Sequence, residues 1–181
     1  MTLRIIAGTY KSRILKTPKI ASTRPTQGML REAIFNICQN EVADARFLDL
    51  FAGSGAMGLE ALSRGASHCT FVEQNRQALT CIKQNIATLG VAPQTKIIPT
   101  DVARALELLA RQQFDLIYID PPYDTIFDLA PVAPLLSANG ILFLEERHNP
   151  KKKHEPAELP GLRLRDARRF GIAILSTYLK G

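Results

Sequence analysis

The chain has no long hydrophobic run. Its 181 residues are 46% hydrophobic and 22% charged, but no uninterrupted apolar stretch approaches the roughly 20 residues that span a bilayer. Residues 1–16 contain no apolar block resembling a signal peptide. This length suits one well-buried core and is too short for two full-sized domains. We therefore expect a cytoplasmic protein with no membrane segment.

Cysteine and histidine are scarce. The three histidines are scattered without metal-ligand spacing, and the three cysteines form no CxxC pair and fall within apolar patterns: Cys38, Cys69 and Cys81. An odd number of cysteines without a motif suggests neither a disulfide framework nor a zinc site. We expect buried free thiols and no metal.

Acidic residues are missing from the start of the chain, where Glu32 is the first. Residues 1–46 hold eight Lys/Arg against three acids, residues 47–146 hold six against eleven, and residues 147–181 hold nine against three. Basic flanks therefore enclose an acidic middle. A segment of one sign suits phosphate neutralisation, although charge alone fits a merely soluble basic surface equally well.

Apolar spacing predicts alternating strands and helices in the middle of the chain. The expected strands are 47–51, 69–72, 96–98, 114–119 and 141–144, and the expected helices are 56–64, 75–88, 102–110 and 126–136. Strands of this almost continuous apolar character predict a parallel sheet with helices on both faces. Residues 162–169 and 172–179 are expected to finish the sheet as an antiparallel pair.

A small extension precedes this alternation. Residues 3–7 and 12–15 flank a Gly-Thr-Tyr turn and predict a short hairpin, and an amphipathic helix is expected from Thr26. We divide the chain into an N-terminal arm, residues 1–45, and a larger domain, residues 46–181.

A glycine-rich turn follows the first core strand and opens a helix, which is the context of a nucleotide-cofactor loop. Cofactor contacts are expected along it, at Asp49, Phe51, Gly53, Ser54 and Gly55. Gly58 would let the helix pack closely on the sheet. Glu73 ends the second strand, where a carboxylate can accept hydrogen bonds from ribose hydroxyls in dinucleotide enzymes and S-adenosylmethionine enzymes alike.

The end of the third strand favours S-adenosylmethionine. Asp101 adds a second acid beside the crevice, where it could accept from an adenine amino group while the Val102 N–H meets the ring. Extra acids would repel the phosphates of a nicotinamide dinucleotide, and S-adenosylmethionine has no pyrophosphate. Asp101 is equally a candidate helix N-cap, and both roles can coexist.

The fourth strand ends in Asp120-Pro121-Pro122-Tyr123. We expect Asp120, Pro121 and Tyr123 to form the catalytic group for methylation of an exocyclic amine. The carboxylate and the Pro121 carbonyl would each accept one N–H, which aims the nitrogen lone pair at the methyl carbon, while the Tyr123 ring stacks on the base. Taken alone, the tetrapeptide could equally be a turn after a strand. If the substrate is the amine of a nucleobase, we expect the basic arm to bind RNA and to line the active site, and residues 46–181 to form the catalytic domain. The expected RNA contacts are Lys11, Arg13, Arg24, Thr26 and Arg31.

The chain resembles the RsmD family of bacterial small-subunit ribosomal RNA guanine-N2 methyltransferases. The resembling residues are Arg4-Ile5-Ile6-Ala7-Gly8, Arg24-Pro25-Thr26, Arg31-Glu32, Phe35-Asn36, Leu48 to Gly55, Gly58 to Gly65, Glu73 and Asp120 to Tyr123. The resemblance implies a Rossmann-like, seven-stranded sheet that binds S-adenosylmethionine, and a target guanine of 16S rRNA in the small subunit or its assembly intermediate. We expect a monomer.

Three alternatives remain. A DNA adenine-N6 methyltransferase would carry the same motif, but usually needs a separate recognition element of about 100 residues for which this chain has no room. Glutamine methylation of a protein is disfavoured, because such sites resemble Asn-Pro-Pro-Tyr. The chain could also be a noncatalytic RNA-binding assembly factor that kept the fold.

Overall fold

The computed structural model describes residues 2–18, 25–122, 128–151 and 154–181. Seven strands form one sheet in the order β3-β2-β1-β4-β5-β7-β6. Their bounds are β1 (Arg46–Leu50), β2 (His68–Val72), β3 (Thr95–Ile98), β4 (Phe114–Ile119), β5 (Leu136–Arg147), β6 (Leu162–Phe170) and β7 (Ala173–Lys180). The pairings among β1 to β5 are parallel, and β7 runs antiparallel to both β5 and β6.

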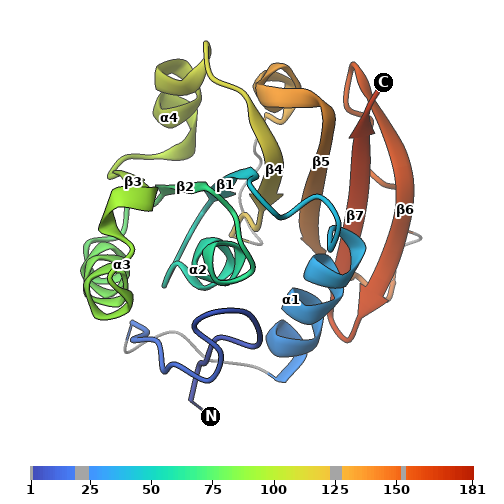
Figure 1. The fold of residues 1–181 in the computed structure, drawn as a ribbon. Helices are drawn as coiled ribbons and strands as arrows, with labels where there is room; N and C mark the ends of the chain where they lie inside the picture. The colour runs from blue at the N-terminus through green and yellow to red at the C-terminus, as the bar shows by residue number, and fades with distance from the viewer. Residues whose placement is uncertain (1, 19–24, 123–127, 152–153) are drawn as a thin grey trace.

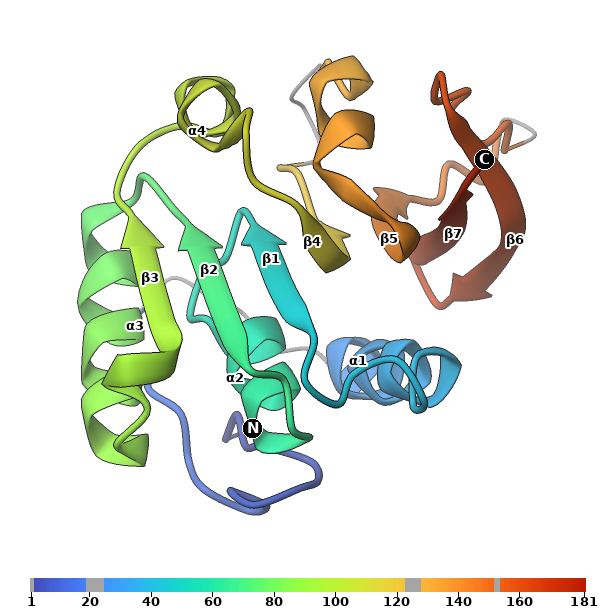
Figure 2. The same ribbon diagram turned by 45° about the horizontal axis from the view of Figure 1, so that its top comes forward.

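Helices cover both faces of the sheet (Figures 1 and 2). They are α1 (Pro25–Ile37), α2 (Ala56–Ser63), α3 (Arg76–Leu89) and α4 (Val102–Leu109), with 3-10 turns η1 (Ala92–Gln94) and η2 (Ala130–Leu135). On β1, Phe47 packs with the apolar side chains of α1, α2 and α3, whereas Leu48 packs with those of α4 and η2. Successive strand residues point to opposite faces, so the apolar strands supply two cores and the predicted two-sided α/β architecture is confirmed.

The prediction of a helix over residues 126–136 is wrong in its described part. Residues 130–135 form the 3-10 turn η2, and Leu136 already begins β5. Two prolines explain the difference: Pro131 lies in the first turn, and Pro134 lacks the N–H that an α-helix would need. Strand β5 consequently starts five residues before the predicted Ile141, and its pairing with β4 shifts register between Phe114 and Leu116.

The N-terminal arm forms a looser hairpin than predicted. Only the Arg4–Ile14 pair is a β-bridge among residues 2–18, although the Ile5 N–H donates to the Arg13 carbonyl at 3.0 Å and the Leu15 N–H to the Leu3 carbonyl at 3.0 Å. Ile5 and Leu15 are buried in the same core as α1 to α3. The arm is thus part of the main core.

Two buried polar side chains attach the arm to the helices. The Glu60 carboxylate on α2 accepts from the Ile6 and Ala7 N–H groups at 2.8 and 3.0 Å. On α3, the Asn85 amide accepts from the Lys16 N–H at 2.7 Å and donates to the carbonyls of Lys16 and Ser54, both at 3.0 Å. Asn85 therefore links the segment that follows the hairpin of the arm directly to the glycine-rich turn.

The cysteine prediction is confirmed, since Cys38, Cys69 and Cys81 are buried free thiols. Among the described residues, no helix combines the length and the apolar character needed to cross a membrane.

Candidate active site

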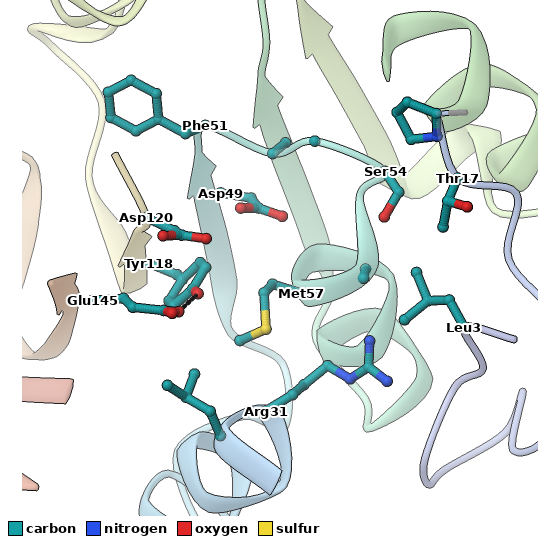
Figure 3. A pocket seen from close by; sticks show the side chains of 15 residues that line it. Leu3, Thr17, Arg31, Asp49, Phe51, Ser54, Met57, Tyr118, Asp120 and Glu145 are labelled. Carbon is teal, nitrogen blue, oxygen red and sulfur yellow. Dashed lines mark hydrogen bonds between the residues drawn. The ribbon is translucent and has the colours of Figure 1, made fainter. Parts of the chain in front are cut away.

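A pocket opens at the carboxyl ends of β1 and β4, between the sheet, α1, α2 and the arm (Figure 3). Its lining combines apolar groups of the arm and helices with acidic side chains from the strands. The lining residues are Leu3, Thr17, Pro18, Leu30, Arg31, Asp49, Phe51, Ala52, Gly53, Ser54, Ala56, Met57, Tyr118, Asp120 and Glu145. The carboxyl edge of a parallel sheet is where α/β proteins bind ligands.

The glycine-rich turn forms one wall of the pocket. Its backbone enters the left-handed region three times, at Phe51 (φ 64°), Gly53 (φ 55°) and Gly55 (φ 78°). Glycine adopts this conformation freely, but Phe51 holds it at a cost of about 1 kcal/mol or more, which is typical of functional loops. The turn places Phe51, Gly53 and Ser54 on the pocket lining, as predicted, while Gly55 is the buried residue that caps α2.

Glu73 braces this turn from the end of β2. One carboxylate oxygen accepts from the Gly53 N–H at 2.7 Å, and the other accepts from the Gln74 and Asn75 N–H groups at 2.9 and 2.7 Å. The side chain therefore lies next to the loop but outside the pocket lining. Its predicted contact with a ribose stays a prediction.

Asp101 and Val102 lie at the start of α4. The Asp101 carboxylate accepts from the Arg104 N–H at 2.9 Å, so the N-cap interpretation is confirmed. This backbone hydrogen bond lowers the pKa of the exposed Asp101. Val102 is buried with the α4 core. Neither residue lines the pocket, and their predicted adenine contacts remain untested.

Asp49 is the most deeply buried acid of the pocket, at 1% exposure. It accepts from the Gly58 N–H at 3.1 Å, which ties β1 to the first turn of α2. Burial is the main reason that its pKa rises to about 7, with the Gly58 hydrogen bond opposing the shift and the charge of Glu73 adding to it.

Asp120 lies beside Asp49, directly after the neighbouring strand β4 (Figure 3). Burial raises its pKa to about 8, with further contributions from the negative charges of Glu145 and Asp49. Pro121 follows it and is half-buried. Tyr123, the third predicted catalytic residue, lies outside the described residues. A group that brings positive charge into this pocket would relieve the crowding of acids.

Tyr118 and Glu145 complete the acidic wall, and neither was predicted from the sequence. The Tyr118 hydroxyl donates to Glu145 Oε2 at 2.5 Å, and both side chains are buried. Burial raises the pKa of Glu145, and the hydrogen bond from Tyr118 opposes that shift. In the sequence alone, Glu145 is simply the polar residue that ends an apolar run, because the pairing of β5 with β4 is not visible there.

The predicted RNA contacts separate into two groups. Lys11 and Arg13 are exposed on the arm, where Arg13 also donates to the Thr88 carbonyl at 3.2 Å. Arg24 and the side chain of Thr26 lie outside what the structure describes.

The expectation that Arg31 belongs to an exposed basic surface is corrected by its burial. It is 5% exposed, donates to the Arg4 carbonyl at 2.6 Å and lies 3.6 Å from the Glu60 carboxylate. Its side chain extends from α1 into the pocket (Figure 3). The amphipathic spacing of α1 could have shown this, because Arg31 follows Leu30 and precedes Ile34 on the inner face.

A family model matches the chain along nearly its whole length, and known proteins match about two thirds of it. A family model described as conserved hypothetical protein 95 matches residues 3–179. The chain is 42% identical over 123 residues to YlbH of Bacillus subtilis, which is named as an rRNA methyltransferase; the match covers 67% of each. It is 37% identical over 123 residues to the ribosomal RNA small subunit methyltransferase D of Escherichia coli, covering 67% of this chain and 60% of that protein.

A solved structure extends the similarity to the complete fold. The Escherichia coli protein described as methyltransferase yhhF superposes with a TM-score of 0.84 and 28% identity, covering 99% of this chain and 98% of that one. The curated sequence matches are shorter: the matched segment spans 60% of the Escherichia coli methyltransferase D and 67% of YlbH.

Proposed function

The chain belongs to the RsmD family, described as conserved hypothetical protein 95, and we propose that it transfers a methyl group from S-adenosylmethionine to the exocyclic N2 of a guanine in 16S rRNA. One observation carries this proposal. The Asp120 carboxylate and the Pro121 backbone lie at the end of β4, beside a pocket walled by the glycine-rich turn. Two hydrogen-bond acceptors at this position support a site in which an amine meets a methyl donor.

The charges of the pocket fit S-adenosylmethionine. The cofactor carries a sulfonium, an ammonium and a carboxylate, and when bound it supplies an electrophilic methyl carbon and a neutral thioether leaving group. Three acids face the pocket, Asp49, Asp120 and Glu145, and Arg31 faces them from α1. We propose that the acids hold the cationic groups and that Arg31 receives the carboxylate, a geometry that guanidinium favours. This proposal replaces the RNA contact predicted for Arg31 with a contact to the cofactor.

The adenosine half would bind along the strand ends beyond the pocket. We propose that Gly53, Ser54 and Gly55 approach the cofactor through their backbone, that Glu73 accepts from its ribose, and that Asp101 and the Val102 N–H contact its adenine ring. Glu73 is supported for this role by its fixed position, since three backbone N–H groups already orient the carboxylate. Phe51 would pack beside the bound cofactor.

The amine is activated by orientation. Guanine N2 is a weak nucleophile because its lone pair is delocalised into the ring. Asp120 and the Pro121 carbonyl would each accept one N–H, which localises that lone pair toward the methyl carbon, and Tyr123 would stack on the base. As the N–C bond forms and the methyl–sulfur bond breaks, N2 becomes positively charged. Asp120 is placed to take the proton that N2 then releases.

The arm is proposed to belong to the RNA surface as well as to the pocket. Residues 1–45 contribute Leu3, Thr17 and Pro18 to the lining, and the exposed Lys11 and Arg13 would contact phosphates together with Arg24 and Thr26. Residues 46–181 would form the catalytic domain. We propose a monomer that acts in the cytoplasm on 16S rRNA within a small subunit or its assembly intermediate.

The substrate is tested by offering several acceptors. Labelled S-adenosylmethionine is incubated with stripped 16S rRNA, small subunits from cells lacking the protein, duplex DNA and a release factor. We expect label in RNA or subunits alone, at one guanine that mass spectrometry locates. Label confined to DNA would instead establish the adenine-N6 alternative.

Asp120→Ala separates an enzyme from an assembly factor that merely kept the fold. We expect methyl transfer to fall by at least about 100-fold, because one of the two amine acceptors is lost. Binding of S-adenosylmethionine, measured by calorimetry, should change far less. Unaltered subunit maturation in cells carrying only the Asp120→Ala protein, together with no transfer by the wild-type protein, would favour the assembly factor.

A further inference from the structure

Glu145 adds negative charge to the proposed cofactor site, but the proposed reaction assigns it no contact with the base. It lies near the end of β5, in the strand next to β4. The parallel register pairs Tyr118 with Phe143 and Ile119 with Leu144, so the next pair in this register is Asp120 with Glu145. Adjacent strands are about 4.8 Å apart. Two carboxylates therefore stand side by side on the same face of the sheet.

Tyr118 fixes the orientation of Glu145. Its hydroxyl donates to Oε2 at 2.5 Å from the preceding row of the sheet. Among the described residues, the other oxygen of Glu145 accepts no hydrogen bond, while the side chain lines the pocket. A buried carboxylate that lines a ligand site, with one oxygen held and the other without a protein partner among the described residues, can serve as a preorganised acceptor.

Guanine presents two donors next to each other on its Watson–Crick edge, N2–H and N1–H. If Asp120 accepts from N2–H, as proposed above, a donor at N1 would meet the neighbouring carboxylate. Adenine presents an amine beside an unprotonated N1, which has a lone pair and no hydrogen. The same two carboxylates would then bring an acceptor against an acceptor, which a buried site strongly disfavours.

We infer that Glu145, oriented by Tyr118, accepts the N1–H of the target guanine and thereby selects guanine over adenine. This inference rests on the proposed guanine-N2 methylation and adds the residue that reads the base. Asp120 holds the reacting amine, Glu145 identifies the ring, and Tyr118 is a positioning residue. The paired carboxylates thus explain why a tetrapeptide common to several amine methyltransferases would act on guanine here.

2-Aminopurine keeps the exocyclic 2-amine but has an unprotonated N1 and no O6 carbonyl, so the variants of Glu145 and Tyr118 are needed to assign a loss of activity to N1. Once the methylated guanine is mapped, 16S rRNA carrying guanine, 2-aminopurine or 7-deazaguanine at that single position is assembled into small-subunit particles. We expect the wild-type protein to prefer guanine over 2-aminopurine by about 100-fold in kcat/KM. It should use 7-deazaguanine, which retains N1–H, nearly as well as guanine.

Glu145→Gln should shrink the preference to within about tenfold, because the amide can donate to the N1 of 2-aminopurine. Tyr118→Phe should reduce it to an intermediate value. Glu146→Gln is the matched control on the same strand: Glu146 faces His154 at 3.6 Å instead of the pocket, and this change should leave the preference unaltered. A general loss of folding would lower transfer to both bases without changing their ratio.

The outcomes distinguish a failure of the proposed function from a failure of the role inferred for Glu145. If the wild-type protein transfers no methyl group to guanine, the proposed function is wrong. If it methylates guanine but uses 2-aminopurine equally well, the proposed function stands and the role of Glu145 is wrong. Equal use of the two bases by the wild-type protein overturns the inference even if Glu145→Gln does not fold, and in that case a narrowed preference in Tyr118→Phe supports it. An unchanged preference in a folded Glu145→Gln protein would overturn it as well.

Discussion

At the scale of single residues, the pocket gathers carboxylates whose ionisation would cost folding stability. The buried Asp49 and Glu145 and the half-buried Asp120 lie together in the pocket, and in each the pKa is raised chiefly by burial. Such groups resist ionisation until a cation arrives. A site built in this way favours a positively charged ligand over its neutral counterpart, which is the difference between a sulfonium and a thioether.

Asp120→Asn should remove part of the pH dependence of folding. The pKa of Asp120 rises from 3.8 to about 8 in the folded protein, so its stabilising effect is complete below about pH 4 and is lost as the pH rises through 8. Between pH 5 and 9 the ligand-free wild type should therefore lose roughly 1–3 kcal/mol more unfolding free energy than Asp120→Asn, allowing for relaxation around the charge. Urea unfolding at both pH values measures this difference.

Exposed Glu158 provides the control for that experiment. Glu158→Gln removes a carboxylate without removing a buried one, and it should lose the same amount of stability as the wild type between the two pH values. If Asp120→Asn also behaves like the wild type, then Asp120 is ionised in the ligand-free fold and the charge argument fails.

Gly58 allows α2 to approach the sheet. A Cβ built there would lie 2.2 Å from Cys69 Sγ and 2.4 Å from Phe71 Cε1, both buried side chains of β2. We expect Gly58→Ala to lower the unfolding free energy by about 1–3 kcal/mol through overpacking. Gly28→Ala is the matched control in α1, where a Cβ meets nothing within 4 Å, and it should stabilise by about 0.5–1 kcal/mol. Chemical denaturation distinguishes the two, and equal effects would contradict the packing argument.

Sequence patterns identified the residues whose neighbours lie close in the chain. Asp49 lies near the end of an apolar strand, and the glycine turn and Asp120 follow apolar strands directly, so their shared location at the carboxyl edge could be predicted. Tyr118 and Glu145 are 27 residues apart, and their pairing depends on the register between β4 and β5. The sequence does not contain that register, because the shift at Phe114 depends on how η2 ends.

At the scale of elements, α2 connects the arm to the pocket through Glu60. This residue has 0% exposure and receives two backbone N–H groups of the arm as well as Arg31 and Arg64. Arg31 in turn extends into the pocket. One carboxylate therefore fixes both the arm and Arg31 of the pocket lining.

Glu60→Gln is expected to loosen the arm. The amide can accept from one N–H but turns its own donors toward the other groups, which leaves buried arginines short of charge. We expect a loss of about 3–5 kcal/mol of unfolding free energy and faster hydrogen exchange at Ile6 and Ala7. Weaker binding of S-adenosylmethionine should accompany it, since Arg31 loses its partner. Exchange detected by mass spectrometry measures the first effect directly.

The matched control is Glu107→Gln in α4. Glu107 pairs with Arg104 on an exposed helix surface, and exposed pairs contribute at most about 1 kcal/mol. This change should leave exchange in the arm unaltered. Unchanged protection of Ile6 and Ala7 in Glu60→Gln would mean that apolar packing of Ile5 and Leu15 holds the arm without the carboxylate.

Elements with a single strong signal were predicted well, and those with competing signals were not. The buried strands and α2 to α4 agree with the apolar spacing to within one or two residues at most ends. Residues 126–136 carry a helical apolar pattern and two prolines, and the described part follows the prolines. The apolar spacing alone does not show whether it or the prolines determine the local structure.

At the scale of the whole molecule, the fold distributes charge unevenly. Three acids of the middle segment, Asp49, Asp120 and Glu145, converge on the pocket, whereas the basic C-terminal flank contains the edge strand β6, far along the sheet from β3. Four of the nine residues of β6 are exposed arginines: Arg163, Arg165, Arg168 and Arg169. Strand alternation predicted the sheet, but not that β7 would insert between β5 and β6. That order makes the arginine strand an edge.

This edge is expected to bind RNA phosphates. Each neutralised phosphate releases counterions, so the logarithm of the binding constant falls linearly with the logarithm of salt concentration, with a slope of roughly 0.7 to 0.9 per contact. Arg163→Gln combined with Arg165→Gln should therefore lower the slope for small-subunit RNA by about 1–2 units. Lys96→Gln combined with Arg111→Gln removes the same charge from exposed positions on β3 and just after α4. Since overall charge changes equally in both proteins, a reduced slope in the first and not in the second locates phosphate contacts on β6. Equal slopes in the two double variants would mean that β6 contributes only to the general field, and that the arm with Lys11 and Arg13 forms the phosphate surface.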